Sequence, residues 1–125
     1  MAQILIIEDD VKFSDVLKEM LERQGYGVIS AYDGEKGIKL YKDNPVPLVI
    51  TDIIMPNKEG VETIFEFLRY FPKAKIIAIS GGGKIKAGDH LKTVSALPNV
   101  KYTFEKPFVM DEFIKAVKEI LGKEI

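Results

Sequence analysis

The chain has 125 residues, with 18 basic and 19 acidic side chains, a formal net charge of -1 and a hydrophobic fraction of 46%. This length predicts one compact, soluble domain, and the balanced charge argues against direct nucleic-acid binding, which needs an excess of Lys and Arg to displace counterions from phosphate. The chain has no Cys and one His, which excludes disulfides, thiolate chemistry and a His-rich metal site.

No segment of the sequence approaches the roughly 20 apolar residues that a membrane-spanning helix needs. The apolar run Ile4–Ile7 ends at three acids, which is unlike the apolar region of a signal peptide. We therefore expect no membrane insertion and a cytoplasmic location.

Five short apolar runs predict strands, at Gln3–Ile7, Gly27–Ser30, Pro47–Thr51, Lys75–Ile79 and Val100–Phe104. The first, third and fourth runs are almost continuously apolar, as in parallel strands buried on both faces. The last run alternates apolar and polar residues, which favours a position at the edge of the sheet.

Amphipathic stretches separate the strands and predict helices. Their apolar residues are Phe13, Val16, Leu17, Met20 and Leu21; Ile38 and Tyr41; Val61, Ile64, Phe65 and Leu68; Leu91 and Val94; and Phe113, Val117, Ile120 and Leu121. Asp33 is a predicted N-cap, and Gly25 is predicted to follow the end of the first helix. The alternation predicts the α/β class: a (βα)5 doubly wound, flavodoxin-like sheet of five parallel strands in the order 2-1-3-4-5.

In such a sheet, a binding site lies outside the carboxyl ends of the strands. The polar residues expected there are Glu8, Asp9 and Asp10 after the first strand, Asp52 after the third, Ser80 after the fourth and Lys106 shortly after the fifth. Two carboxylates about 4 Å apart repel by roughly 4 kcal/mol at an effective dielectric of 20. A hard divalent cation such as Mg²⁺ relieves that repulsion, so the pattern predicts a Mg²⁺ site.

Asp52 is the candidate nucleophile, because a carboxylate can attack phosphorus to give an aspartyl phosphate. Lys106, Ser80 and the metal could then stabilise the phosphoryl oxygens. Each residue alone also has an ordinary interpretation: Asp10 can be a helix N-cap, and Asp52 and Ser80 can be turn residues. Their coincidence at successive strand ends favours the functional site.

Four motifs in this order, ILIIEDD, LVITDIIMPNKEG, IIAISGGG and FEKPF, resemble those of the response-regulator receiver domain of two-component signalling, over essentially the whole chain. The resemblance implies that Glu8 and Asp9 are the acidic pair that binds Mg²⁺. It implies that Asp52 is both a metal ligand and the phosphoacceptor, and that the backbone carbonyl of Ile54 completes the protein's ligands.

By the same resemblance, Ser80 matches the Ser/Thr that turns toward the phosphoryl group, and Lys106 matches the lysine that contacts it. Receivers usually have Tyr or Phe three residues before this lysine, where this chain has Thr103. Because strand neighbours face opposite ways, Tyr102 and Phe104 cannot replace that aromatic residue without a change of register. Ser80, Thr103 and Tyr102 are therefore the candidate switch residues, with simple packing as the alternative for Tyr102.

The resemblance implies a phosphorylation-dependent signalling switch rather than an enzyme, apart from its own aspartyl phosphorylation and dephosphorylation. The implied partners are a sensor histidine kinase or histidine phosphotransfer protein, and a downstream effector protein or relay. Residues 1–125 are expected to be a single receiver domain without an output domain, as a monomer or a weak phosphorylation-dependent dimer. The alternative is a non-phosphorylated, receiver-like interaction module, which would ordinarily have lost Asp52, Lys106 or the acidic pair.

Ile54 and Gly82 occupy positions where related domains often carry polar side chains that orient the attacking water. Neither residue can do so here. The sequence therefore predicts slow autodephosphorylation.

Overall fold

A computed structural model describes residues 2–53, 60–80, 97–106 and 108–122. The strands are Ile4–Ile7 (β1), Val28–Ala31 (β2), Leu48–Asp52 (β3), Ile76–Ser80 (β4) and Val100–Glu105 (β5), and the helices in the described ranges are Val11–Arg23 (α1), Gly34–Asp43 (α2), Gly60–Tyr70 (α3) and Met110–Leu121 (α5). The helix predicted around Leu91 and Val94 lies outside these ranges. None of the described helices is long and apolar enough to span a membrane.

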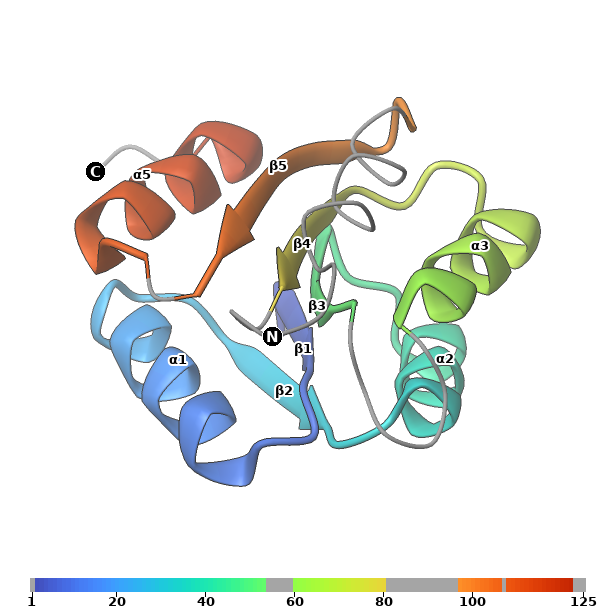
Figure 1. Ribbon diagram of the computed structural model, residues 1–125, viewed down its shortest axis with the longest axis horizontal. Coiled ribbons are helices and arrows are strands. Elements are labelled where there is room, and N and C mark those ends of the chain that lie inside the picture. The colour runs from blue at the N-terminus through green and yellow to red at the C-terminus, as the bar shows by residue number, and fades with distance from the viewer. Residues whose placement is uncertain (1, 54–59, 81–96, 107, 123–125) are drawn as a thin grey trace.

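All five strands are parallel and form one sheet in the order β2-β1-β3-β4-β5. Helices α1 and α5 cover one face of the sheet, and α2 and α3 cover the other (Figure 1). The predicted strand order and the edge position of β5 are confirmed. The right-handed crossovers of alternating strands and helices explain this arrangement.

The two sheet faces bury separate hydrophobic cores, which explains why the central strands are continuously apolar. Leu5, Ile7 and Val49 point into the core under α2 and α3. Ile4 and Ile50 point into the core under α1 and α5.

The exposed fractions correct two residues of the predicted helix faces. Phe65 is 47% exposed, whereas Phe67 is fully buried beside Ile64. Val16 is 50% exposed, whereas Leu17 is fully buried. Consecutive helical residues point about 100° apart. The rotation of the helix against the sheet therefore decides which of two adjacent apolar residues, Ile64 or Phe65 in α3 and Val16 or Leu17 in α1, is buried.

Short polar side chains fix the amino ends of α1 and α2 near the carboxyl ends of the strands. The Asp10 carboxylate accepts a hydrogen bond from the Phe13 backbone N–H at 3.1 Å, and the Asp33 carboxylate accepts one from Lys36 at 2.8 Å. Gly25 follows α1 with a φ of 96°, a left-handed conformation that favours glycine. The predicted caps at Asp33 and Gly25 are confirmed, and Asp10 caps α1.

Strand β5 contains an irregularity near its start. Ile76 of β4 pairs with Val100, but Ile77 pairs with Tyr102, so Lys101 is an extra residue in the ladder. Val100 consequently packs in the α2/α3 core, whereas Tyr102 and Phe104 pack against the α1/α5 core. A strictly alternating strand would have placed all three on one face.

Candidate functional site

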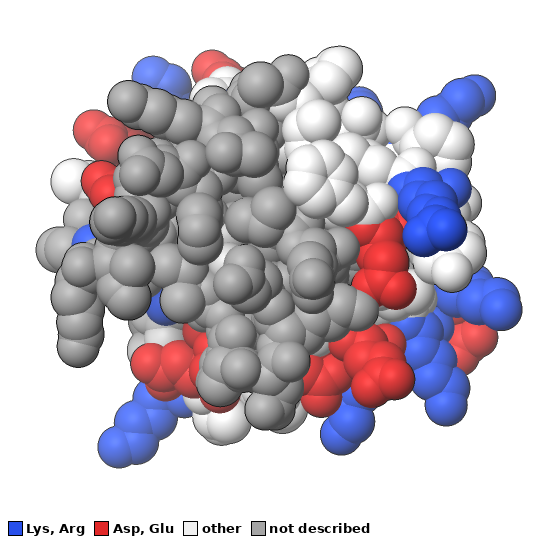
Figure 2. Space-filling view, turned by 45° about the vertical axis from the view of Figure 1, so that its right-hand side comes forward, with Lys and Arg blue, Asp and Glu red and all other residues white. Residues whose placement is uncertain are grey.

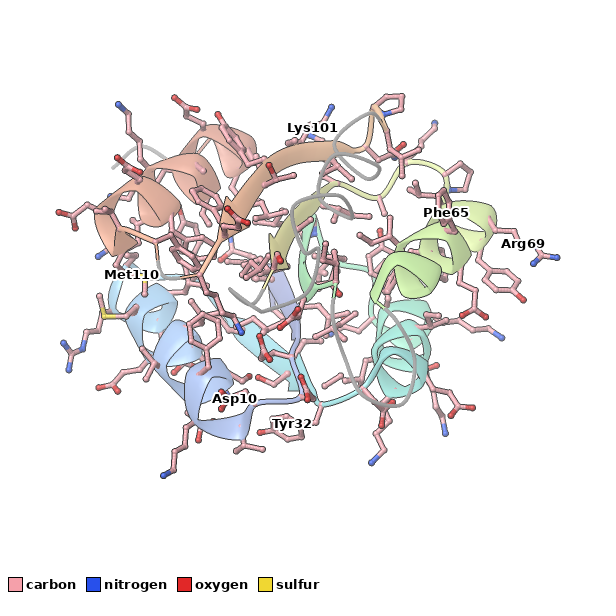
Figure 3. The ribbon with its side chains drawn as sticks, viewed as in Figure 1. Asp10, Tyr32, Phe65, Arg69, Lys101 and Met110 are labelled. Carbon is pink, nitrogen blue, oxygen red and sulfur yellow. The ribbon has the colours of Figure 1, made fainter. Side chains whose placement is uncertain are left out.

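The carboxyl ends of the parallel strands bring distant residues to one edge of the sheet. Glu8 directly follows β1, Asp52 ends β3, Ser80 ends β4 and Lys106 directly follows β5. In Figure 3, the labelled Asp10 and Tyr32 lie at this edge, while Lys101 lies at the opposite end of the sheet. The strand topology alone therefore assembles the polar groups that the sequence indicated.

Three carboxylates form the centre of this edge. Glu8, Asp9 and Asp52 each offer an oxygen atom within 4.8 Å of the others. Glu8 is 2% exposed and Asp52 is 4% exposed, while Asp9 is half-buried. Closely spaced carboxylate oxygens are the donors that Mg²⁺ prefers, so these residues fit the predicted metal. The predicted carbonyl ligand, Ile54, lies outside the described residues.

The ammonium group of Lys106 bridges two of these carboxylates. Its Nζ lies 3.1 Å from Glu8 Oε1 and 3.2 Å from Asp52 Oδ2, and its side chain is 21% exposed. The backbone N–H of Lys106 also donates to the Ser80 carbonyl at 2.8 Å, which ties the end of β5 to the end of β4. One ammonium cannot balance three carboxylates, which is the electrostatic reason that a divalent cation fits here.

The pKa of Glu8 is raised from the ordinary value of 4.5 to about 8, mainly by burial and next by the neighbouring Asp52 carboxylate. The Asp10 backbone N–H, which donates to Glu8 Oε2 at 3.0 Å, opposes the rise. For Lys106, burial lowers the pKa, but the charges of Asp52 and Glu8 outweigh burial and the net shift is upward. Lys106 therefore carries a positive charge in the site.

The candidate switch residues lie on the last two strands: Ser80 ends β4, and Thr103 and Tyr102 face opposite sides of the sheet on β5. Ser80 is fully buried at the end of β4, and Thr103 is half-buried opposite Ala78. Tyr102 faces the other side of the sheet, where its hydroxyl donates a hydrogen bond to the Glu119 carboxylate of α5. This contact agrees with the packing interpretation of Tyr102, and the switch roles of the three residues stay predictions.

The site has a further neighbour, Phe13, which the sequence pattern predicted only as an apolar residue on the packed face of a helix. The Lys106 Nζ lies 4.1 Å from the centre of the Phe13 ring, in the first turn of α1. Helical side chains lean toward the amino end of their helix, and the amino end of α1 faces the strand ends. The sequence carried no local signal of this contact, because Lys106 comes near the Phe13 ring only through the placement of β5 in the sheet.

A doubly wound five-stranded parallel sheet with an acidic cluster and a lysine at its carboxyl ends places the molecule among the flavodoxin-like α/β domains. The family model described as "Response regulator receiver domain" matches residues 4–118. The chain therefore belongs to the receiver-domain family of two-component response regulators, which are signalling modules. The predicted family and fold are confirmed.

Relatives and solved structures agree with this membership. The chain is 32% identical over 124 residues to the transcriptional regulatory protein CpxR of Escherichia coli (strain K12), covering 98% of this chain and 50% of CpxR. It is also 32% identical over 124 residues to Protein CcdB of Bacillus subtilis (strain 168), covering 98% and 99% of the two chains. The response regulator protein TrrA from Thermotoga maritima, solved in complex with Mg(2+)-BeF, has 30% identity and a TM-score of 0.80, with 96% and 99% of the two chains covered. This chain spans about half the length of the first curated relatives it matches.

Proposed function

We propose that this protein is a phosphorylation-dependent switch in which Asp52 accepts a phosphoryl group from the phosphohistidine of a sensor histidine kinase or a histidine phosphotransfer protein. The observation that carries the proposal is the placement of Asp52. Its carboxylate is almost fully buried at the end of β3, bonded to Lys106 and clustered with Glu8 and Asp9. Membership of the receiver family supports the same assignment.

In the proposed reaction, a carboxylate oxygen of Asp52 attacks phosphorus. The new P–O bond forms as the P–N bond to the donor imidazole breaks, and the imidazole, whose other ring nitrogen already carries a proton, leaves as a neutral group with the electron pair of the P–N bond. Lys106 holds the Asp52 carboxylate at 3.2 Å and offsets the charge of the incoming group. Ser80 would donate its hydroxyl to a phosphoryl oxygen.

Glu8, Asp9 and Asp52 would hold Mg²⁺, together with the carbonyl of Ile54. When bound, this cation supplies positive charge next to the phosphoryl oxygens. The Mg(2+)-BeF complex of the relative TrrA supports the choice of metal.

The output is proposed to be a change of affinity for a downstream effector protein, or transfer of the phosphoryl group along a relay. Phosphorylation adds roughly 1.5 to 2 negative charges to a site that is already acidic. Figure 2, in which the side with α2 and α3 comes forward, shows acidic and basic side chains interspersed. Where the described residues show on this face, charges of both signs are present, unlike the continuous positive charge that favours binding to a nucleic-acid backbone.

The deciding experiment is incubation with Mg²⁺ and acetyl phosphate, followed by intact mass spectrometry. We expect the gain of one phosphoryl group, and no gain in the Asp52→Asn variant. Asp43→Asn is the matched control, because Asp43 is exposed at the end of α2 and should leave the gain unchanged. A wild-type protein that gains nothing would favour the non-phosphorylated interaction module.

Slow autodephosphorylation is proposed as a second property of the site. It rests on the apolar residue at position 54, which offers no group to orient an attacking water. Ile54→Asn should accelerate loss of the phosphoryl group after the donor is removed, measured by the decay of the phosphorylated mass. An unchanged or slower decay would contradict the idea.

A further inference from the structure

The ring of Phe13 is a third neighbour of the Lys106 ammonium, besides the two carboxylates. The distance from Nζ to the ring centre is 4.1 Å, within the range in which the negative face of an aromatic ring attracts a cation. An ammonium group has three N–H donors, and two of them are directed at Glu8 and Asp52. Lys106 therefore contacts two carboxyl groups and one aromatic ring.

The Phe13 ring is itself held firmly. Its backbone N–H binds the Asp10 cap, and its ring packs edge to face on Phe108, with ring centres 6.1 Å apart. Phe108 in turn packs on Phe104 and Phe113, each at 5.3 Å between ring centres. These four rings, Phe13, Phe104, Phe108 and Phe113, form an aromatic cluster that reaches from the α1/α5 core to the site.

An uncharged partner for Lys106 is important because the same carboxylates can bind either the ammonium or Mg²⁺. Glu8 and Asp52 bind Lys106, and the same residues belong to the acidic cluster that fits Mg²⁺. A cation shared by these oxygens weakens their hold on the ammonium and repels it. The long, flexible side chain of lysine can then move its ammonium group away from the two carboxylates. A ring face does not bind Mg²⁺ and does not titrate, so its attraction for Lys106 persists in every charge state of the site.

We infer that Phe13 is a positioning residue, which keeps the Lys106 ammonium over the phosphoacceptor when the carboxylates are engaged by a divalent cation. This inference rests on the proposed function. The aromatic cluster then has a role besides packing, because it holds the Phe13 ring in place and the ring holds the Lys106 ammonium.

The first test compares Phe13→Leu with Phe13→Tyr in phosphorylation by acetyl phosphate at saturating Mg²⁺. Leucine keeps a large apolar side chain, although a smaller one, and removes the ring face, so we expect the rate constant to fall about three- to tenfold, the range that a partly exposed cation–π contact supplies. Tyrosine keeps the ring face, so its rate should stay within about twofold of wild type. Mg²⁺ affinity, measured by titration, should be equal or tighter in the leucine variant, because a less tethered ammonium repels the cation less.

A purely structural role predicts a different pattern. General damage by leucine would lower the rate, the Mg²⁺ affinity and the melting temperature together, and this result would overturn the inference. Equal rates for the leucine variant and wild type would overturn it as well.

The second test does not depend on phosphorylation. Protons on the Lys106 Cε that lie over an aromatic face are shielded, so their NMR signal should be shifted upfield in wild type and Phe13→Tyr but not in Phe13→Leu, with Mg²⁺ present. An upfield shift that disappears on adding Mg²⁺ to wild type would overturn the positioning role even if Asp52 is phosphorylated. A protein that shows the shift but gains no phosphoryl group would instead overturn the proposed function, and with it the task given to Phe13.

Discussion

Both faces of the sheet bury a group of aromatic rings, but the two groups extend to different parts of the molecule. Under α2 and α3, Tyr41 contacts Phe67 and Phe71, with ring centres 5.2 and 4.5 Å apart, and Phe71 in turn contacts the exposed Tyr70 at the surface. Under α1 and α5, the aromatic cluster continues to Phe13 and ends against the charged Lys106. The rings under α2 and α3 therefore contribute to stability, whereas those under α1 and α5 also contact a residue of the site.

The largest expected effect tests the structural face. Phe67 is fully buried in the core under α2 and α3, where its ring contacts Tyr41 and Phe71, so Phe67→Ala should lower the free energy of unfolding by about 3–5 kcal/mol, measured by urea denaturation. Because this is a large share of a domain's total stability, Phe67→Leu provides a milder variant that keeps the protein folded. Its phosphorylation rate should match wild type, and a slowed rate would show that the two faces are not separate in function.

The next effect concerns the acidic site and its dependence on pH. Glu8 binds its proton more tightly in the folded protein, where its pKa is about 8, than at its ordinary value of 4.5. Glu8 therefore contributes its full stabilisation to the folded protein below about pH 4.5, and this contribution is lost as the pH rises through 8. The loss in the free energy of unfolding is at most about 1.4 kcal/mol for each unit of pKa difference. Melting temperatures in EDTA should fall over this range.

Two controls isolate Glu8 in that measurement. Glu8→Gln resembles the protonated side chain and should flatten the fall. Mg²⁺ should restore stability most strongly at the alkaline end, because it binds the ionised carboxylate. A wild-type profile that rises between pH 5 and 8 in EDTA would contradict the sign of this effect.

Local and topological signals made most of the fold readable from the sequence. The apolar run Ile4–Ile7 and the caps Asp10 and Asp33 act through neighbours within a few residues. Once the strands were known to be parallel, Glu8 and Asp52 had to meet at one edge. The structure does bring them together with Asp9 and Lys106, although their chemical roles stay predictions.

The sequence could not reveal features set by three-dimensional packing. The choice between Phe65 and Phe67 as the buried residue depends on the rotation of α3 against the sheet. The extra residue Lys101 in β5 depends on pairing with β4. The contact between Phe13 and Lys106 joins side chains from opposite ends of the chain, so no local pattern contains it.

A smaller effect tests how closely α2 approaches the sheet. A Cβ at Gly37 would lie 2.4 Å from Cδ1 and 2.6 Å from Cγ1 of the fully buried Ile7. Gly37→Ala should therefore cost about 1–3 kcal/mol through overpacking, less what alanine gains in helix propensity. Adding Ile7→Val, which removes Cδ1, should recover part of the loss.

A second glycine provides the control for that coupling. A Cβ at Gly25 would meet nothing within 4 Å, but its φ of 96° strains any other residue. Gly25→Ala should cost on the order of 1 kcal/mol through the backbone alone, and Ile7→Val should not recover any of it. Equal recovery at both positions would rule out a specific clash between Gly37→Ala and Ile7.

The smallest effect separates the two faces by the titration of their tyrosines. The hydrogen bond from the Tyr102 hydroxyl to Glu119 is the main cause that raises the pKa of Tyr102, whereas burial raises the pKa of Tyr41 on the other face. Both shifts favour the neutral phenol, but only the first depends on a carboxylate. Glu119→Ala should therefore lower the pKa of Tyr102 toward 10 and leave the pKa of Tyr41 unchanged, measured from the Cζ signals of ¹³C-labelled tyrosine.

Glu112→Ala, at the exposed start of α5, is the matched control and should change neither signal. If the pKa of Tyr102 stays raised without Glu119, its contact with α5 does not govern its titration, and burial dominates on both faces of the sheet.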